Sequence, residues 1–442
     1  MRIIIIGAGD FGYHIAKALC KKNDVVIVEK EPASLDRIGE LDVHTLQGNG
    51  GDVKVLVEAG VKKADLFVAV TRSDELNIVA CMAAKLLNPD IRTIARVSNP
   101  DYIDKPVDRR NKIGVDAMVC PELALAAEFE QVVSMPSAVS VENLVSGKVK
   151  MVEFKINKFN PLVGKKLSEA NIPHGCVISA IFRKSELMIP HGDDVILVGD
   201  RILSVGRLES ITEFRKMFGE SPGQKFRVAI IGGGNVGFYL ANMLRKTDFY
   251  IKLIERDKKR CEELAEKLRG ILIVHGDGTD ISLLKEEDIG SMDVTVSATD
   301  SDERNLLCSL LAKQFGAKKV AARVDRFEYT RLFEMVGIDV AMSPIQATVN
   351  EVLKSTMGTG IESLINIEEE KGKIIELTAN QGSKAVSAPL KDLKFPKGAI
   401  ISVIVRDNDV IVPDGSHVIA PGDRVIVFAL TSAVSKVESL FG

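Results

Sequence analysis

The sequence predicts an α/β fold with two Rossmann-like, doubly wound parallel sheets, each followed by a small α+β domain. Three observations support this prediction. A G-x-G-x-x-G motif occurs twice, at 7–12 and 232–237. After each motif, short apolar strands alternate with helical patterns, which is typical of a parallel sheet covered by helices on both faces. Strand-rich segments broken by Gly, Pro and Asp turns then follow in each half.

The chain is a tandem repeat. Gly232 lies 225 residues after Gly7, and the offset between later matching segments stays near this value. The matching pairs are Glu29 with Glu255, 48–50 with 276–278, 71–77 (TRSDELN) with 299–305 (TDSDERN), 95–97 with 322–324, 188–192 with 411–415, and 199–201 with 422–424. A whole unit of about 225 residues has therefore been duplicated.

The elements of the first copy follow from hydrophobic spacing. Strands are predicted at Ile3–Ile6, Val25–Val28, Val43–Leu46, Leu66–Val70, Thr93–Ala95 and Ala117–Val119, and helices at Phe11–Lys22, Val53–Ala59 and Glu75–Leu87. Pro121 starts a last helix, Glu122–Val133. The second copy repeats this order from Arg227 to Leu353, with Pro344 in the place of Pro121.

The small domains are predicted from shorter, β-branched segments. Their strands are expected at Val177–Phe182, Glu186–Ile189, Val195–Val198, Ile400–Val405, Val410–Val412 and Arg424–Phe428. We expect four domains, 1–135, 138–220, 225–355 and 361–442, with links at Pro222-Gly223 and Ser355–Gly360.

Composition narrows the function classes. The net charge of −3 argues against nucleic acid as a partner, because a nucleic-acid-binding domain normally shows a strong basic face. No apolar run approaches the ~18 residues of a membrane span, and no signal peptide is visible, so we expect a cytoplasmic location, peripheral to the membrane. The six cysteines and six histidines show no ligand spacing, which predicts small core cysteines and no metal site.

The first glycine motif follows a strand and opens a helix, which is the context that a dinucleotide fingerprint requires. Gly7 allows a tight turn, Gly9 lets the backbone approach a pyrophosphate, and Gly12 lets the helix pack close to the sheet. Phosphates would then rest on the helix N-terminus. Because the second copy repeats the motif, we expect two nucleotide sites; tight packing without a ligand is the alternative.

An acidic residue ends the next strand in both copies, at Glu29 and Glu255. An acid at this distance from the motif binds the ribose hydroxyls of an adenosine and repels a 2′-phosphate, which favours NAD(H) over NADP(H). Lys30 and Arg256 follow directly. These cations would either pair with the acids or reach a 2′-phosphate, and the sequence leaves both readings open.

Two further pairs of side chains follow later strands. Asn49 and Asp277 could face the adenine, or serve as plain turn residues. Thr71 and Thr299 could contact ribose or phosphate, or mark the start of a helix.

Arg96 and Arg323 end the fifth strand and are predicted to point into the same crevice. Each could bind a phosphate bidentately or form an internal ion pair. The last helices, Glu122–Val133 and Gln346–Leu353, have apolar faces; either a nucleotide that bridges the crevice orders these helices, or the faces pack simply on their own sheet.

Together these residues resemble a known family. The G-x-G-x-x-G, the acid, the G-[ND]-G turn, the T-x-S-D-E-x-N helix start and the A-R-V strand are similar to the nucleotide-binding domain of the regulator-of-K⁺-conductance (RCK) family. The strand-rich segments resemble its C-terminal companion domain. The likeness covers nearly the whole chain, in the tandem form of the peripheral subunits of Trk potassium-uptake systems.

The resemblance implies a regulatory subunit that is not an enzyme. It implies a gating ring of self-associated dimers or tetramers, which binds NAD(H) and ATP or ADP and acts on a Trk-type membrane potassium channel subunit of the TrkH/TrkG kind. Motifs and resemblance together give these cofactor-binding residues: Gly7, Ala8, Gly9, Asp10, Phe11, Glu29, Asn49, Gly50, Thr71, Arg72, Arg96, Gly232, Gly233, Gly234, Asn235, Val236, Glu255, Asp277, Gly278, Thr299 and Arg323.

The two copies differ at Asn49/Asp277 and Arg72/Asp300. The second site loses a positive charge and gains two negative ones, which should weaken binding of a γ-phosphate. We therefore expect unequal sites, with ATP preferring the first.

Two other functions were weighed. An NAD-dependent oxidoreductase needs a positioned acid or base, usually His, Lys or Tyr. His174 and His191 lie in turn-like segments, and Lys397 and Asp414 stand at their places in the second copy, so surface histidines are the better interpretation. A redox-sensing repressor needs a helix-turn-helix and a basic face, and the sequence shows neither.

Overall fold

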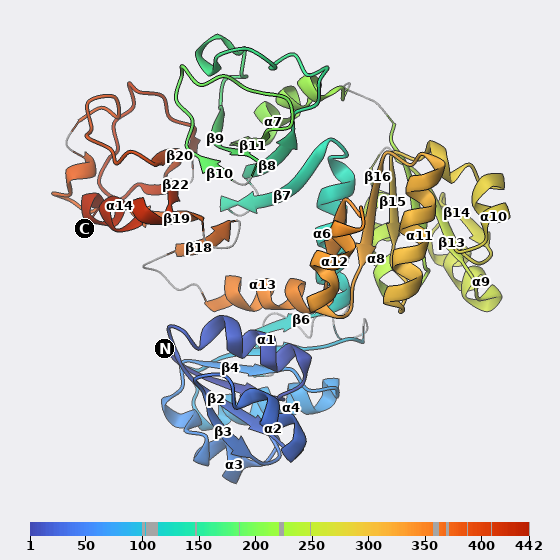
Figure 1. Cartoon of the computed structure of the whole chain (residues 1–442). Coiled ribbons are helices and arrows are strands. Elements are labelled where there is room, and N and C mark those ends of the chain that lie inside the picture. Colours follow the sequence, from blue (N-terminus) through green and yellow to red (C-terminus); the bar gives the residue numbers. More distant parts are fainter. Residues whose placement is uncertain are drawn as a thin grey trace. The chain divides into compact units, whose positions relative to one another are not determined.

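The structure is a computed structural model that describes residues 1–99, 102, 114–145, 148–184, 186–220, 225–247, 249–356, 362–367, 371–386, 388–407 and 409–441 (Figure 1). The chain divides into two compact units, Met1–Glu130 with Phe226–Thr356 and Gln131–Lys225 with Met357–Gly442. The predicted links at Pro222-Gly223 and at 357–360 lie outside the described residues. The four predicted domain boundaries stay a prediction.

The first sheet has six parallel strands in the order β3-β2-β1-β4-β5-β6. Its strands are β1 (Arg2–Ile6), β2 (Asp24–Glu29), β3 (His44–Gln47), β4 (Leu66–Ala69), β5 (Arg92–Arg96) and β6 (Ala117–Val119). The helices are α1 (Asp10–Leu19), α2 (Pro32–Ile38), α3 (Val53–Glu58), α4 (Asp74–Leu87) and α6 (Pro121–Ser134). The predicted doubly wound parallel sheet is confirmed.

The second sheet repeats this order as β14-β13-β12-β15-β16-β17. Its strands are β12 (Arg227–Ile231), β13 (Tyr250–Glu255), β14 (Leu272–His275), β15 (Val294–Ser297), β16 (Lys319–Arg323) and β17 (Val340–Met342). The helices are α8 (Asn235–Leu244), α9 (Lys258–Lys267), α10 (Ile281–Glu286), α11 (Asp302–Phe315), α12 (Thr330–Met335) and α13 (Pro344–Thr356).

The apolar run of β1 is continuous because both faces of this central strand are covered. Ile3 and Ile5 lie in a core cluster with residues of α1 and α2, whereas Ile4 and Ile6 lie in another cluster with residues of α3 and α4. Strand β1 lies between β2 and β4. The chain runs outward from β1 through β2 to β3 and then crosses back to β4 on the other side of β1, so the order of strands reverses at this point. Ligands of doubly wound sheets bind at such a switch point, outside the carboxyl ends of the strands.

One helix of the second copy packs on the first copy. Val349 and Val352 of α13 share a core cluster with Ile15 and Leu19 of α1, and Figure 1 shows these two helices side by side. Asn350 of α13 also donates a hydrogen bond to the Glu128 carboxylate of α6, at 3.1 Å. The apolar face of the last helix of the second copy therefore packs on the first copy instead of simply on its own sheet.

The second unit contains two antiparallel sheets, ordered β10-β9-β11-β8-β7 and β18-β19-β22-β20-β21. The first comprises β7 (Ala138–Leu144), β8 (Val149–Lys155), β9 (Cys176–Arg183), β10 (Glu186–Met188) and β11 (Arg201–Arg207), with helix α7 (Leu208–Phe214). The second comprises β18 (Glu362–Ile367), β19 (Gly372–Thr378), β20 (Ala399–Arg406), β21 (Asp409–Ile411) and β22 (Arg424–Leu430), with helix α14 (Val434–Phe441). Buried residues of both sheets form one core cluster.

The predicted strand at Val195–Val198 is wrong. This segment is a turn in which Leu197 and Val198 are exposed and Val195 forms only an isolated bridge. The Asp200 carboxylate holds the turn, because it accepts a hydrogen bond from the Leu197 amide and pairs with Arg183. The actual strand, β11, begins at Arg201.

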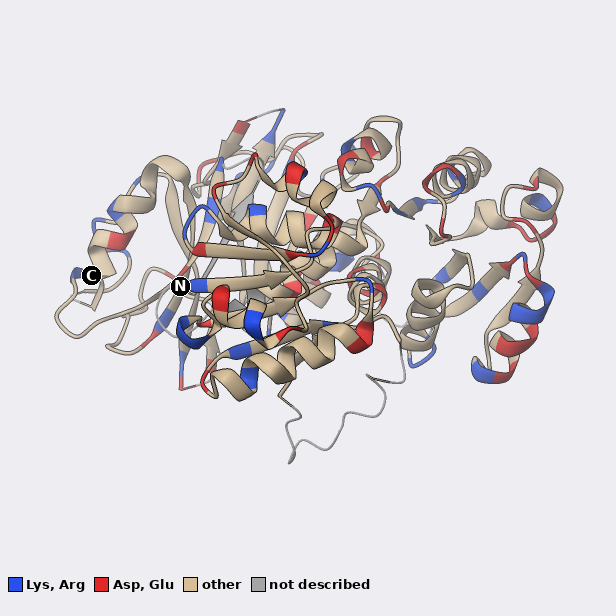
Figure 2. Cartoon of the chain, turned by 90° about the horizontal axis from the view of Figure 1, so that it is seen from below, with Lys and Arg blue, Asp and Glu red and all other residues tan. Residues whose placement is uncertain are grey.

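Acidic and basic residues are mixed along the elements that Figure 2 displays, in agreement with the net charge of −3. Among the described helices, none is both long enough and apolar enough to cross a bilayer.

Candidate functional site

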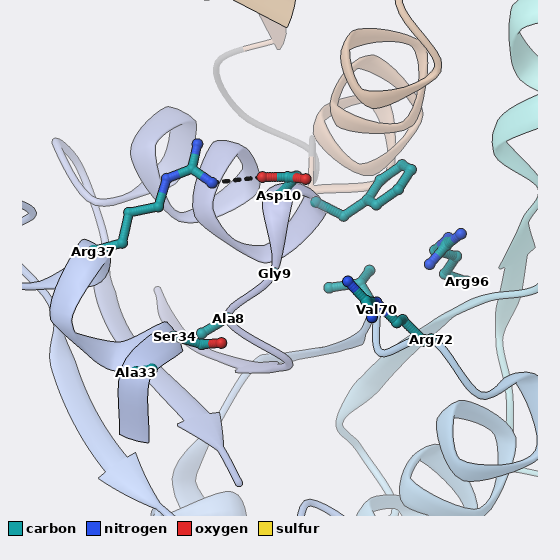
Figure 3. Close-up of a pocket in the computed structure, with 10 residues that line it drawn as sticks. Ala8, Gly9, Asp10, Ala33, Ser34, Arg37, Val70, Arg72 and Arg96 are labelled. Carbon is teal, nitrogen blue, oxygen red and sulfur yellow. Dashed lines mark hydrogen bonds and ion pairs between the residues drawn. The ribbon is translucent and has the colours of Figure 1, made fainter. Parts of the chain in front are cut away.

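Two cavities lie at the switch point of the first sheet, with volumes of about 400 Å³ and about 420 Å³. All eleven residues predicted for the first site line one or both of them: Gly7, Ala8, Gly9, Asp10, Phe11, Glu29, Asn49, Gly50, Thr71, Arg72 and Arg96. Figure 3 shows the smaller cavity, with Gly9 and Asp10 at the start of α1, Arg37 on one side, and Arg72 and Arg96 on the other. The structure thus brings the predicted residues together.

The glycine motif has two structural glycines and one that the protein itself does not need. Gly7 has φ +102°, a conformation that favours glycine, and a Cβ on Gly12 would lie 1.8 Å from the Gly7 carbonyl oxygen. At Gly9, by contrast, φ is −67° and a Cβ would meet nothing within 4 Å. Gly9 therefore opens space in front of the first amides of α1, where no side chain caps the helix. Gly234 has the same geometry.

Glu29 is held by backbone amides. Its carboxylate accepts hydrogen bonds from the Ala8 amide at 2.6 Å and from the amides of Lys30 and Glu31 at 2.7 and 3.0 Å. Glu255 accepts in the same way from the amides of Gly233 and Asp257, at 2.6 and 2.8 Å. Among the described residues neither acid forms an ion pair. Of the roughly four lone-pair sites of a carboxylate, Glu255 keeps two for the hydroxyls of a ribose, and Glu29 keeps one.

Thr71 and Thr299 are fixed by a buried asparagine. Asn77 accepts from the Thr71 amide and hydroxyl at 2.8 and 2.7 Å, and it donates to the Thr71 and Arg96 carbonyls at 3.1 and 2.9 Å. Asn305 makes the same four bonds to Thr299 and Arg323, at the same distances. The helices that follow are capped by Ser73 and Ser301, so the threonines are not the caps.

The turn residues have local partners as well. Asn49 accepts a hydrogen bond from the Gly51 amide at 3.0 Å, and Asp277 accepts from the amide and hydroxyl of Thr279. The Thr279 amide is the main reason that the pKa of Asp277 lies below its usual range. A Cβ on Gly50 would lie 2.0 Å from Ile6, so close packing on β1 explains this glycine. Gly278 lies equally close to Ile231.

Two arginines of the first crevice form no ion pair or hydrogen bond with an acid among the described residues. Arg72 makes no hydrogen bond or ion pair with any described residue. Arg96 donates to the Thr71 carbonyl at 3.2 Å and to the Ser98 hydroxyl at 3.3 Å, while its buried Nε has no partner. The Arg96 guanidinium lies 4.2 Å from the centre of the Phe11 ring, and burial lowers the pKa of Arg96 from its usual value.

A third arginine, Arg37, lines the same cavity from the side opposite Arg72 and Arg96, and it was not among the predicted residues. Arg37 of α2 pairs with Asp10 at 2.5 Å and reaches Glu328 of the second copy at 3.7 Å (Figure 3 shows the Asp10 pair). The helix itself was not predicted, because its seven residues show no clear apolar period. Pro32 at its first turn is the one signal that could have indicated it.

The second crevice has the same backbone and different charges. Asp300 stands at the place of Arg72, and Glu263 at that of Arg37. Arg323 is paired with Asp325, with Nε–Oδ1 and NH2–Oδ2 distances of 2.7 and 3.1 Å. Arg260 of α9 donates to the Gly233 carbonyl at 2.8 Å and so lies against the glycine turn.

The remaining candidates show structural roles. Burial raises the pKa of the Cys120, Cys176 and Cys308 thiols to about 12, and also raises those of Cys81 and Cys261. A raised pKa leaves little reactive thiolate at neutral pH. In the described part of the chain, no group of three or more His, Cys, Asp or Glu residues is arranged to hold a metal ion.

Comparison with known families matches both halves of the chain. The TrkA-N domain matches residues 3–121 and 228–344, and the TrkA-C domain matches residues 151–219 and 374–442. The chain is 52% identical to "Trk system potassium uptake protein TrkA homolog 1" of Methanosarcina mazei, over 100% of both chains. It is 41% identical to the Archaeoglobus fulgidus homologue, again over 100% of both, and 35% identical to the Haemophilus influenzae TrkA, over 100% of this chain and 98% of the relative.

Solved structures agree on the fold. The GsuK RCK domain superposes with a TM-score of 0.61 at 18% identity, over 100% of this chain and 94% of that one. The GsuK channel bound to NAD gives the same score and identity, over 100% of this chain and 78% of that one. With two TrkA-N and two TrkA-C domains and full-length relatives, the chain belongs to the TrkA family of Trk-system potassium-uptake proteins.

Proposed function

We propose that the chain is a regulatory subunit of potassium transport that binds adenine nucleotides in its two crevices and performs no chemistry of its own. Nucleotide binding changes the shape of a ring of such subunits, and the ring acts on a Trk-type membrane channel subunit. NAD(H), ATP and ADP are the ligands in question. The names of the relatives and the NAD complex of GsuK support this proposal.

The observation that carries the proposal is the environment of Gly9. The protein does not need a glycine there, since the backbone is ordinary and a Cβ would enter open space. The open space lies before the free amides of α1 and forms part of a cavity lined by Arg72 and Arg96. A polyphosphate explains the open space at Gly9, the free helix amides and the two arginines together. It would fill the space, and both helix N-termini and guanidinium groups bind anionic oxygens.

The second cavity suits the nucleoside. It is lined by Glu29, by the Asn49-Gly50 turn and by the side chain of Leu76. Glu29 would accept a ribose hydroxyl, and the apolar Leu76 would contact the base. An acid at this position repels a 2′-phosphate, so NAD(H) is favoured over NADP(H).

The two sites are proposed to be unequal, with ATP preferring the first. Arg72 becomes Asp300 in the second copy, and Asn49 becomes Asp277. A ligand shifts a regulatory equilibrium only by its difference in affinity for the two states, so unequal sites allow one chain to respond differently to two nucleotides.

Calorimetry with ATP, ADP, NADH, NAD⁺ and adenosine tests nucleotide binding directly. Gly9→Trp fills the first site and Gly234→Trp the second, and neither Cβ meets the chain. We expect Gly9→Trp to weaken ATP binding at least about a hundredfold, because the indole occupies the phosphate position, while Gly234→Trp leaves the tighter ATP site intact. Equal ATP affinities in the two variants would disprove the inequality.

Regulation is tested by potassium flux through the co-purified membrane channel subunit, with each nucleotide in turn. We expect at least one nucleotide to change the flux, and the change to disappear in a Gly9→Trp, Gly234→Trp double variant. A potassium flux that no nucleotide changes would contradict the proposed regulatory function. A protein that gives no heat with any adenine compound would remove nucleotide binding itself.

A further inference from the structure

We propose that the residue two positions after the β5 or β16 arginine, Ser98 in the first copy and Asp325 in the second, determines whether a crevice accepts a terminal phosphate. A serine leaves the arginine free for a nucleoside triphosphate. An aspartate forms an ion pair with the arginine, and this restricts the site to ligands whose phosphates are internal, as in a dinucleotide. This inference rests on the proposed nucleotide-binding function.

The backbone around the arginine is the same in both copies, so the side chain at this position is the difference. Asn77 and Asn305 donate to the carbonyls of Arg96 and Arg323, both at 2.9 Å. The Ser98 amide donates to the Asp74 carboxylate at 2.9 Å, and the Asp325 amide donates to the Asp302 carboxylate at 2.7 Å.

In the first copy the guanidinium is positioned, and no carboxylate among the described residues bonds to it directly, although the nearby charges of Glu122 and Asp74 partly offset the lowering of its pKa by burial. Its contacts are two long hydrogen bonds, to the Thr71 carbonyl and to the Ser98 hydroxyl, and the face of the Phe11 ring. Its buried Nε has no partner. Since Arg96 lines the same cavity as Gly9 and Arg72, a phosphate there would meet an arginine whose donors are incompletely used. Buried donors without partners are costly, which favours a ligand that supplies an acceptor.

In the second copy the corresponding guanidinium, that of Arg323, already forms an ion pair. Asp325 takes its Nε and one NH2 hydrogen in a bidentate pair at 2.7 and 3.1 Å. The Arg323 side chain is 18% exposed, so solvent screens this pair only in part. A terminal phosphate would have to displace a carboxylate that is tethered two residues away, and would then be repelled by it. A pyrophosphate held on the α8 amides needs no such displacement.

Arg72 and Asp300 also distinguish the crevices, and single substitutions separate the two causes. In a Gly234→Trp background, which isolates the first site, Ser98→Asp should weaken ATP binding about tenfold or more and leave adenosine within about twofold, because charge-assisted contacts to the terminal phosphate are lost. Ser98→Asn is the matched control: it is similar in size, carries no charge and should change ATP binding by less than about threefold. Asp325 shows that this backbone accommodates an aspartate beside Asp302.

The reciprocal variant is Asp325→Ser in a Gly9→Trp background, which isolates the second site. It should tighten ATP binding several-fold and leave NADH nearly unchanged. Both variants could instead bind nucleotides with the same ratio of ATP affinity to adenosine affinity as the single Trp variants from which they are made. In that case the proposed role of Ser98 and Asp325 is wrong, and the proposed function stands. If the unmodified chain binds no adenine nucleotide, the proposed function fails and this inference fails with it.

Discussion

The two crevices of the first unit share a frame and differ in charge. In both, a buried asparagine makes four hydrogen bonds of matching length to the β4–α4 or β15–α11 turn. In both, an acid accepts the amide of the middle residue of the glycine turn at 2.6 Å. Around this frame, Arg72 is replaced by Asp300, Arg37 by Glu263 and Ser98 by Asp325.

This comparison separates the residues that hold the backbone of a crevice from those that set its charge. The frame residues bond to the backbone, so changing one alters the turn itself. Of the differing residues, Arg37 and Arg72 line the cavity, and the side chains of Ser98 and Asp325 bond to the neighbouring arginine, so they change without altering the sheet. The duplication therefore kept the position for a nucleotide twice and gave each position its own electrostatic environment.

The largest effect is expected from exchanging the arginine and aspartate that follow β4 and β15. Arg72→Asp should weaken ATP binding to the first site by about ten- to a hundredfold, because it removes a charge-assisted contact of about 1.5–3 kcal/mol and adds repulsion. Asp300→Arg should strengthen ATP binding to the second site. Calorimetric titrations with ATP and with adenosine, in variants whose other site is blocked by Gly9→Trp or Gly234→Trp, measure both effects. Affinities that do not change on the exchange would show that the charge difference has no role.

A second prediction concerns the shared frame. Asn77→Ala and Asn305→Ala should each lower the local opening free energy by roughly 2 kcal/mol, because each leaves buried backbone groups without partners. Hydrogen exchange of peptides covering 66–77 and 294–305 should then speed up about thirtyfold, and to the same degree in both copies. An effect confined to one copy would break the claim that the frames are equivalent.

The smallest effect tests the contact between copies. Glu328 lies 3.7 Å from Arg37, with side chains 62% and 45% exposed, so this ion pair is worth at most about 1 kcal/mol. Glu328→Gln removes one of the two carboxylates beside Arg37 and leaves the Asp10 pair in place, so the lower negative charge should tighten ATP binding about two- to fivefold, with less effect at high salt. Weaker ATP binding in this variant would mean that Glu328 supports the site rather than competes with it.

The repeat made most of the fold predictable. Two copies of the glycine motif, the acid and the T-x-S-D-E-x-N segment aligned the two halves and indicated a doubly wound sheet in each, and the first eleven site residues do meet at one switch point. The same repeat could have corrected the strand at Val195–Val198, because 199–201 aligns with 422–424 and β22 was correctly placed after it.

Arg37 and the partner of α13 were beyond prediction for a physical reason. The position of Arg37 over the glycine turn depends on how α2 packs, which no local pattern in seven residues encodes. The apolar face of α13 indicates burial but not the surface that buries it, and the structure places α1 of the other copy there. The functional difference between Ser98 and Asp325 likewise appears only once the guanidinium beside each is located.

The seam between α13 and α1 has an evolutionary consequence. If two identical chains met through such a seam, every mutation would appear on both sides of the twofold axis, and their pockets could not diverge. Joining the two halves in one polypeptide keeps them at high effective concentration while freeing each from the symmetry of the other. The covalent link thus permits the charges of the two halves to diverge, as they do at Arg72 and Asp300.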